Sequence, residues 1–258
     1  MKQSRFSRIY PIVMTILTYV PIAVVTVYSF NESKLSSRWD GFSLKWYAEL
    51  FRDSSIADAL GNSLFLGITA SLLSAVIATA AALGMDKSTL PGRKAVEKLA
   101  LLPLIIPEIV LGMVFLAYFA RLHIPFGMLT LIIAHTAFCI PYVYTEVSAG
   151  LANLDRSAIE AARDLGATRL GAFFTVTLPM LAPAIASGMF FSFAMSFDDV
   201  IISIFVTGVN VNTLPIKIYT QIKTGLSPKS NALCTIMLIA AVACTTIGYV
   251  IRQRSKNK

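Results

Sequence analysis

Residues 160–166 read Glu160-Ala161-Ala162-Arg163-Asp164-Leu165-Gly166, and Leu178-Pro179 follows a little further along the chain. This polar stretch separates long apolar runs. Ser157 and Glu160 have the spacing of a capping box, which predicts that a helix begins at Ser157. Gly166 can adopt the left-handed conformation that ends helices. A second segment, 170–176, precedes the prolines, so we expect a short helix, a glycine turn and another short helix.

The composition around this stretch indicates a membrane protein. The chain has 258 residues, of which 56% are hydrophobic and 14% charged, and its mean hydropathy is +0.70. A soluble domain of this size carries about 25% charged residues. The basic balance, net +8, is spread between apolar runs and therefore indicates membrane topology rather than nucleic-acid binding. The three cysteines, Cys139, Cys234 and Cys244, lack metal-ligand spacing, so no metal site or disulfide framework is expected.

Six apolar segments are long enough to span a bilayer, for which about 20 residues are needed. The sequence therefore predicts an all-α, polytopic protein that forms one transmembrane domain over residues 1–258. The first segment is too long for a signal peptide and is expected to be retained. Pro103 and Pro107 predict a kink or break in the third segment, and small residues in the second predict close helix packing. The expected spans are 9–30, 62–85, 98–120, 126–149, 181–207 and 232–251.

The lysines and arginines indicate an orientation. With the N-terminus in the cytoplasm, 14 of the 22 lie on the cytoplasmic side, as the positive-inside rule expects. Both termini and the loop at about 150–180 are then cytoplasmic, and the loops at about 31–61 and 208–231 are external. In the last of these, apolar residues four apart predict a short amphipathic helix that ends at Gly225.

Four carboxylates fall within the expected spans: Glu108, Glu146, Asp198 and Asp199. Buried charges in a membrane are costly and usually face a pathway or a partner. We expect a pathway role for Glu108 and for one of the two aspartates, while the other caps or pairs locally. Glu146 is expected to bond a neighbouring helix. His123 and His135 have no ligand-spaced partners and are expected to be structural.

The polar loop resembles the signature of ABC importer permeases: Glu-Ala-Ala, three residues, Gly, nine residues, an aliphatic residue, one residue, then Leu-Pro. Val176 supplies the aliphatic residue. In that family the loop docks on an ATP-hydrolysing subunit. The resemblance thus implies ATPase-coupling roles for Glu160, Ala161, Ala162, Gly166, Leu178 and Pro179. The chain has no G-x-x-x-x-G-K-[ST] sequence, the phosphate-binding loop of many ATPases. We therefore expect a transport subunit, not an enzyme, whose partner uses ATP and Mg while this chain binds no cofactor.

A closer resemblance covers nearly the whole chain. The runs 196–200, 205–208, 214–219 and 227–233 are similar to spermidine/putrescine permeases of the second permease type, with Glu108 where aspartate is common. The resemblance implies a multi-pass subunit of a bacterial inner membrane that pairs with a homologous permease. It also implies two copies of a cytoplasmic ATP-binding subunit and an extracytoplasmic polyamine-binding protein. The expected substrate-pathway residues are Glu108, Asp198, Asp199, Phe197, Tyr118 and Tyr219.

Two alternatives stay open at the level of sequence. One is an ABC permease for another substrate, such as ferric iron or an opine. The other is an ion-coupled secondary transporter that works without an ATPase. A membrane enzyme is disfavoured, because nothing in the sequence groups a nucleophile with a base. The choice between spermidine and putrescine also stays open.

Overall fold

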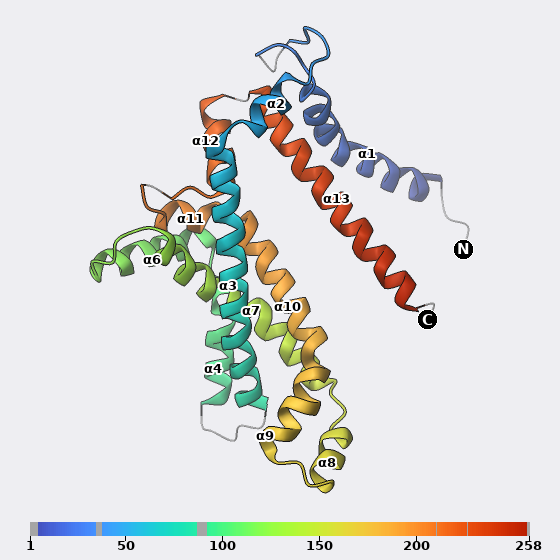
Figure 1. The fold of residues 1–258 in the computed structure, drawn as a ribbon, viewed down its shortest axis with the longest axis vertical. Helices are drawn as coiled ribbons and strands as arrows, with labels where there is room; N and C mark the ends of the chain where they lie inside the picture. The colour runs from blue at the N-terminus through green and yellow to red at the C-terminus, as the bar shows by residue number, and fades with distance from the viewer. Residues whose placement is uncertain (1–4, 35–37, 87–91, 210, 226, 257–258) are drawn as a thin grey trace. The chain divides into compact units, whose positions relative to one another are not determined.

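The structure is a computed structural model that describes residues 5–34, 38–86, 92–209, 211–225 and 227–256. The described residues form helices, with a single isolated β-bridge between Asn31 and Phe42, which confirms the all-α class. Cys244 and the charged side chains near both termini lie outside the described side chains. The chain divides into two compact units, residues 1–57 with 218–258 and residues 58–217. Figure 1 colours the chain by residue number, from blue at the N-terminus to red at the C-terminus.

The first unit combines the two ends of the chain. Helix α1 pairs with α13, and α2 packs on α13 as well. The short helix α12 ends just before Gly225, which has φ +120°, so the helix predicted in the loop at about 208–231 is confirmed. The helices here are α1 (Arg5–Tyr28), α2 (Lys45–Phe51), the end of α12 (Leu214–Thr224) and α13 (Pro228–Lys256).

Asn31 organises the segment between α1 and α2. It is fully buried, and its side-chain oxygen accepts the backbone N–H of Asp40 at 3.0 Å. Its backbone carbonyl accepts the indole N–H of Trp46 at 2.7 Å. A loop that buries backbone polar groups must pair them, and Asn31 does so. Further along, the Lys229 ammonium bonds the Asp53 carboxylate.

The second unit is built around α7 and α10, which pack along each other. Gly188 on α10 permits a close approach, since a Cβ there would lie 2.8 Å from the Cα of Val143 on α7. Small residues allow helices in lipid to pack closely. The helices of this unit are α3 (Ser54–Asp86), α4 (Arg93–Ala100), α5 (Leu102–Ile105), α6 (Glu108–Arg121), α7 (Met128–Ala152), α8 (Ser157–Asp164), α9 (Arg169–Ala172), the π-helix η1 (Phe173–Thr177), α10 (Leu178–Asp198) and α11 (Ile201–Val206).

The small face expected in the second span is confirmed on α3. Ala70, Ser74 and Ala78 are fully buried, and the Ser74 hydroxyl lies 3.0 Å from the hydroxyl of Ser192 on α10. A polar pair of this kind satisfies both groups away from water. Helices α3, α7 and α10 therefore form the packed centre of the unit.

Two of the expected spans are interrupted. The third is broken, as its prolines predict: Ile106 and Pro107 are extended between α5 and α6. The fifth ends at Asp198, because Asp199 is extended, and α11 continues beyond it. Four helices among the described residues are long and apolar enough to cross a membrane, and Pro228–Ala243, the part of α13 before Cys244, is a shorter apolar stretch. The count of six spans stays a prediction.

Candidate functional site

The polar loop at residues 150–180 begins with a cap that the sequence did not identify. Helix α8 does begin at Ser157, but the predicted capping box is wrong: the N-cap position belongs to Arg156, and the N–H of Glu160 donates to the Arg156 carbonyl at 3.0 Å. Instead, the Asp155 carboxylate accepts the backbone N–H of Ser157 at 2.9 Å. That bond holds the pKa of Asp155 below its usual range. An aspartate two residues upstream is an equally good acceptor for the free N–H groups of a helix start.

Gly166 ends α8 as predicted. Its φ is +92°, its N–H donates to the carbonyl of Arg163, and the N–H of Ala167 donates to the carbonyl of Ala162, both at 3.0 Å. These two bonds define a Schellman motif. Thr168 then caps α9 by accepting the N–H of Gly171 at 3.0 Å. The turn therefore fixes α8 and α9 relative to each other through backbone hydrogen bonds.

The expected coupling residues lie at the surface of this loop or next to it. Glu160, Ala161 and Gly166 are exposed, as is Pro179 at the start of α10, while Ala162 and Leu178 are half-buried. Three neighbouring apolar side chains were not among the predicted site residues: Leu165, Leu170 and Phe174, which are 91%, 71% and 61% exposed. Large exposed apolar groups mark interaction sites. Their presence in a polar loop was a signal available from the sequence.

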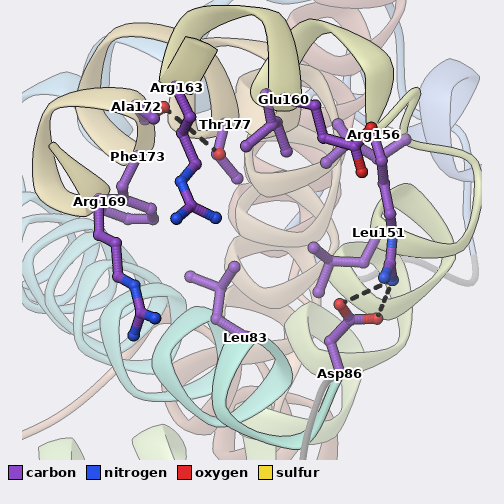
Figure 2. Close-up of a pocket in the computed structure, with 12 residues that line it drawn as sticks. Leu83, Asp86, Leu151, Arg156, Glu160, Arg163, Arg169, Ala172, Phe173 and Thr177 are labelled. Atoms are coloured by element: carbon purple, nitrogen blue, oxygen red, sulfur yellow. Dashed lines mark hydrogen bonds and ion pairs between the residues drawn. The ribbon is translucent and has the colours of Figure 1, made fainter. Parts of the chain in front are cut away.

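A cavity of about 520 Å³ lies behind α8 and α9, against the ends of α3 and α7. Leu83, Leu151 and Phe173 form part of its apolar wall, and Arg163 and Arg169 extend into it (Figure 2). At its rim the Arg156 guanidinium bonds both oxygens of Asp86, at 3.1 and 3.0 Å. This ion pair ties the end of α3 to the start of the loop.

The two adjacent aspartates have different environments. Asp199 is buried, and its carboxylate accepts the N–H of Ile202 at 3.1 Å and both the N–H and the hydroxyl of Ser203 at 2.8 Å. It therefore caps α11. Asp198 is exposed at the last position of α10. The structure thus assigns the local capping role to Asp199.

His135 completes the surroundings of Asp199. Its ring is fully buried on α7, with Nδ1 2.8 Å from the Ser196 hydroxyl and Nε2 3.0 Å from the Ser203 hydroxyl. Nε2 also lies 3.4 Å from the Asp199 carboxylate. Buried polar groups joined in this way hold their elements in one arrangement. The structural role expected for His135 agrees with this network, which joins α7, α10 and α11.

The other expected pathway residues fall in two places. Glu108 is the first residue of α6. Phe197 stacks on Phe193, with ring centroids 5.6 Å apart, and Tyr118 is 58% exposed on α6. Tyr219 belongs to the other unit, where the Lys223 ammonium lies 4.6 Å from its ring centroid.

Glu146 behaves as expected for a carboxylate that bonds a neighbouring helix. It lies on α7, and one of its carboxylate oxygens accepts the hydroxyl of Ser187, on α10, at 3.1 Å. The bond spans the same helix pair that Gly188 brings close together. Glu146 therefore contributes to the α7–α10 contact.

The long apolar helices, joined by a capped polar loop and interrupted at carboxylates, are typical of a membrane protein with several spans. The chain belongs to the family of binding-protein-dependent transport system inner membrane components, whose profile matches residues 76–257. This is a permease family of ABC transporters.

Individual relatives cover almost the whole chain. The putrescine transport system permease protein PotI of Escherichia coli K12 is 37% identical over 247 residues, which cover 93% of this chain and 88% of PotI. The spermidine/putrescine permease protein PotC of Haemophilus influenzae is 33% identical, and 93% of each chain is covered. PotC of Escherichia coli K12 is 35% identical over 93% of this chain and 90% of that protein.

Solved structures share the fold. A chain of a bacterial ABC transporter that imports the acidic polysaccharide alginate superposes with a TM-score of 0.69 at 15% identity, over 98% of this chain and 99% of that one. A chain of the methionine ABC transporter MetNI gives 0.62 at 17% identity, over 77% and 95%. At such low identity the likeness concerns the fold alone. It supports the permease architecture independently of the sequence relatives.

Proposed function

We propose that this chain is the permease subunit of an ATP-driven importer of polyamines, spermidine or putrescine. The observation that carries the proposal is the similarity to polyamine permeases over 93% of the chain. The family membership supports the importer class, and the carboxylates at the helix breaks suit a cationic substrate. In this proposal the chain forms half of the pathway in a bacterial inner membrane, with both termini in the cytoplasm.

The loop between α7 and α10 is the proposed contact with the ATPase. Exposed Glu160 and the apolar side chains of Leu165, Leu170 and Phe174 offer one charge and a surrounding apolar surface. Interfaces of this composition bury the apolar groups and pair the charge. One copy of the ATP-binding subunit binds this loop, and a second copy binds the corresponding loop of the homologous permease. ATP and Mg are bound by those subunits, and an extracytoplasmic binding protein delivers the polyamine.

The proposed pathway uses Asp198 and Glu108 as separate anionic contacts for a polycation. Asp198 carries an exposed carboxylate at the end of α10, whereas the oxygens of Asp199 are already engaged by α11. Phe197 and Tyr118 add aromatic faces, which attract ammonium groups, and Tyr219 is the candidate from the other unit. Contacts of this kind are weak enough to release the substrate.

The test is uptake of radiolabelled spermidine and putrescine by vesicles that contain the assembled transporter. Asp198→Asn and Glu108→Gln should each reduce polyamine uptake about tenfold or more, because each removes one charge contact. Glu49→Gln, which changes an exposed carboxylate on α2, is the matched control and should keep normal uptake. Normal uptake by both pathway variants would favour a different substrate, such as ferric iron or an opine.

A second arm tests the dependence on an ATPase. The purified chain, reconstituted alone, should not transport, while the assembled transporter should transport only with ATP. Glu160→Lys should leave the subunit in the membrane yet separate ATP hydrolysis from uptake. Transport by the chain alone would identify an ion-coupled secondary transporter instead.

A further inference from the structure

The cavity behind α8 and α9 contains two positive charges that the coupling role does not use. Five charged residues line it, and two of them, Asp86 and Arg156, neutralise each other. Within the described residues, neither Arg163 nor Arg169 lies within 4.0 Å of a carboxylate, although Glu160 lines the same cavity. The cavity therefore has a net positive charge, carried by two guanidinium groups.

Both groups line the cavity from the loop, one from each of its two short helices. Arg163 lies in the last turn of α8 and Arg169 is the first residue of α9. Between them the Gly166 turn ends α8, and two backbone hydrogen bonds hold the turn. Figure 2 shows both side chains extending from the loop toward the end of α3, where Leu83 lies.

Two guanidinium forks favour a phosphate over a carboxylate. Each fork can donate two parallel bonds to an anion. A carboxylate has two oxygens, which one fork occupies, whereas a phosphate group has enough oxygens to accept from both forks at once. Because arginine stays charged at all physiological pH values, the cavity attracts such an anion without a change of protonation.

The size and the walls of the cavity add a second requirement. A volume of about 520 Å³ falls within the range of small-molecule sites, about 300–1,000 Å³, and exceeds what a phosphate ion alone needs. The lining also has apolar members, among them Leu83, Leu151 and Phe173. An occupant that matches both parts of the lining carries a phosphate at one end and a less polar group at the other.

We propose that this cavity binds a phosphate ester through Arg163 and Arg169. Two sources share this chemistry: the head group of an anionic phospholipid, since basic pockets at membrane-helix ends bind such groups, and a soluble phosphate ester of the cytoplasm. The site does not depend on which substrate the transporter carries. Its occupant would bridge the two arms of the coupling loop, α8 and α9.

The experiment uses the assembled transporter in nanodiscs of phosphatidylcholine. Binding of glycerol 3-phosphate is measured by calorimetry, with glycerol as the uncharged control compound. Arg163→Gln/Arg169→Gln should weaken binding on the order of a hundredfold, because two charge-assisted contacts are lost. Arg121→Gln, which changes an exposed arginine at the end of α6, should bind as the wild type does.

A second arm identifies the source. The transporter is placed in nanodiscs that contain phosphatidylglycerol, and the lipid retained after delipidation is counted by native mass spectrometry. Retention that the double variant abolishes assigns the site to the phospholipid. Binding of glycerol 3-phosphate without lipid retention assigns it to a soluble ester. Should the double variant fail to assemble, Arg163→Lys and Arg169→Lys keep the charge but lose the fork, and each should weaken binding severalfold.

The proposal is overturned if the wild-type transporter neither binds glycerol 3-phosphate saturably nor retains phosphatidylglycerol. It is equally overturned if either form of binding is the same in the double variant and in the wild type. An acidic side chain of the ATPase that fills the cavity would give the first of these results. Because both arms measure binding and not uptake, failure here is distinct from failure of the polyamine assignment.

Discussion

Asp198 and Asp199 offer a matched pair for testing how the structure divides the work of two adjacent carboxylates. Both are changed to asparagine, which keeps the size and removes the charge. In the wild type the Asp199 carboxylate accepts the backbone N–H groups of Ile202 and Ser203. In Asp199→Asn the side chain keeps one acceptor oxygen, and its NH₂ group faces one of these two N–H groups. That N–H is left without a partner in a buried place, and the helix cap is weakened.

The magnitude follows from these two losses. A buried donor without a partner costs about 1–3 kcal/mol, and a lost helix cap costs about 1 kcal/mol. We therefore expect Asp199→Asn to lower the free energy of unfolding by about 2–4 kcal/mol. Asp198 is exposed at a helix end, where a surface change stays within about 0.5 kcal/mol. The Asp198 variant should thus be as stable as the wild type yet impaired in polyamine uptake.

The assay is thermal unfolding of both variants in detergent, followed by size-exclusion chromatography of the remaining folded fraction. Membrane proteins often unfold irreversibly, so apparent midpoints are compared at one heating rate. The Asp199 variant should lose several degrees and the Asp198 variant almost none. Equal midpoints for the two variants, or a lower one for Asp198→Asn, would refute the assignment of Asp199 as the structural carboxylate.

Three further predictions concern other parts of the chain. Gly166→Ala should destabilise the end of α8 by about 1–2 kcal/mol, because its φ of +92° disfavours a side chain although no atom would contact the added Cβ. Gly84→Ala, in the helix α3, adds a Cβ that also meets no atom and should not destabilise the protein. Faster amide exchange in the loop of the Gly166 variant alone is the expected result. The hydrogen bond from Lys229 lowers the pKa of Asp53 to about 2. The wild type should therefore be more stable than Lys229→Met above about pH 4, and this difference should disappear as the pH falls toward 2. Unfolding midpoints of both proteins across this pH range measure the difference. Gly188→Val should reduce the yield of folded protein, as its Cβ would meet the α7 backbone; unchanged yield would contradict the packing.

Much of the fold could be predicted from the sequence because its signals are local. The apolar runs fixed where helices occur, since a lipid environment requires every backbone group to bond within its own segment. Pro107 and Gly166 acted through their own backbone geometry, and both produced the expected break and turn. The capping box failed for a local reason as well: Asp155 accepts the N–H of Ser157, which the Glu160 carboxylate was expected to satisfy, and the N–H of Glu160 donates to the carbonyl of Arg156.

The sequence by itself determined the helical class, the family and the position of the polar loop, because each depends on the order and spacing of residues along the chain. Only the tertiary structure decided which carboxylate of the pair is buried, since the burial of Asp199 depends on His135, 64 positions away on another helix. The same holds for Arg163 and Arg169, which line one cavity together with residues from the ends of α3 and α7. Residues separated along the chain come to share a site only when packing brings their elements to one place.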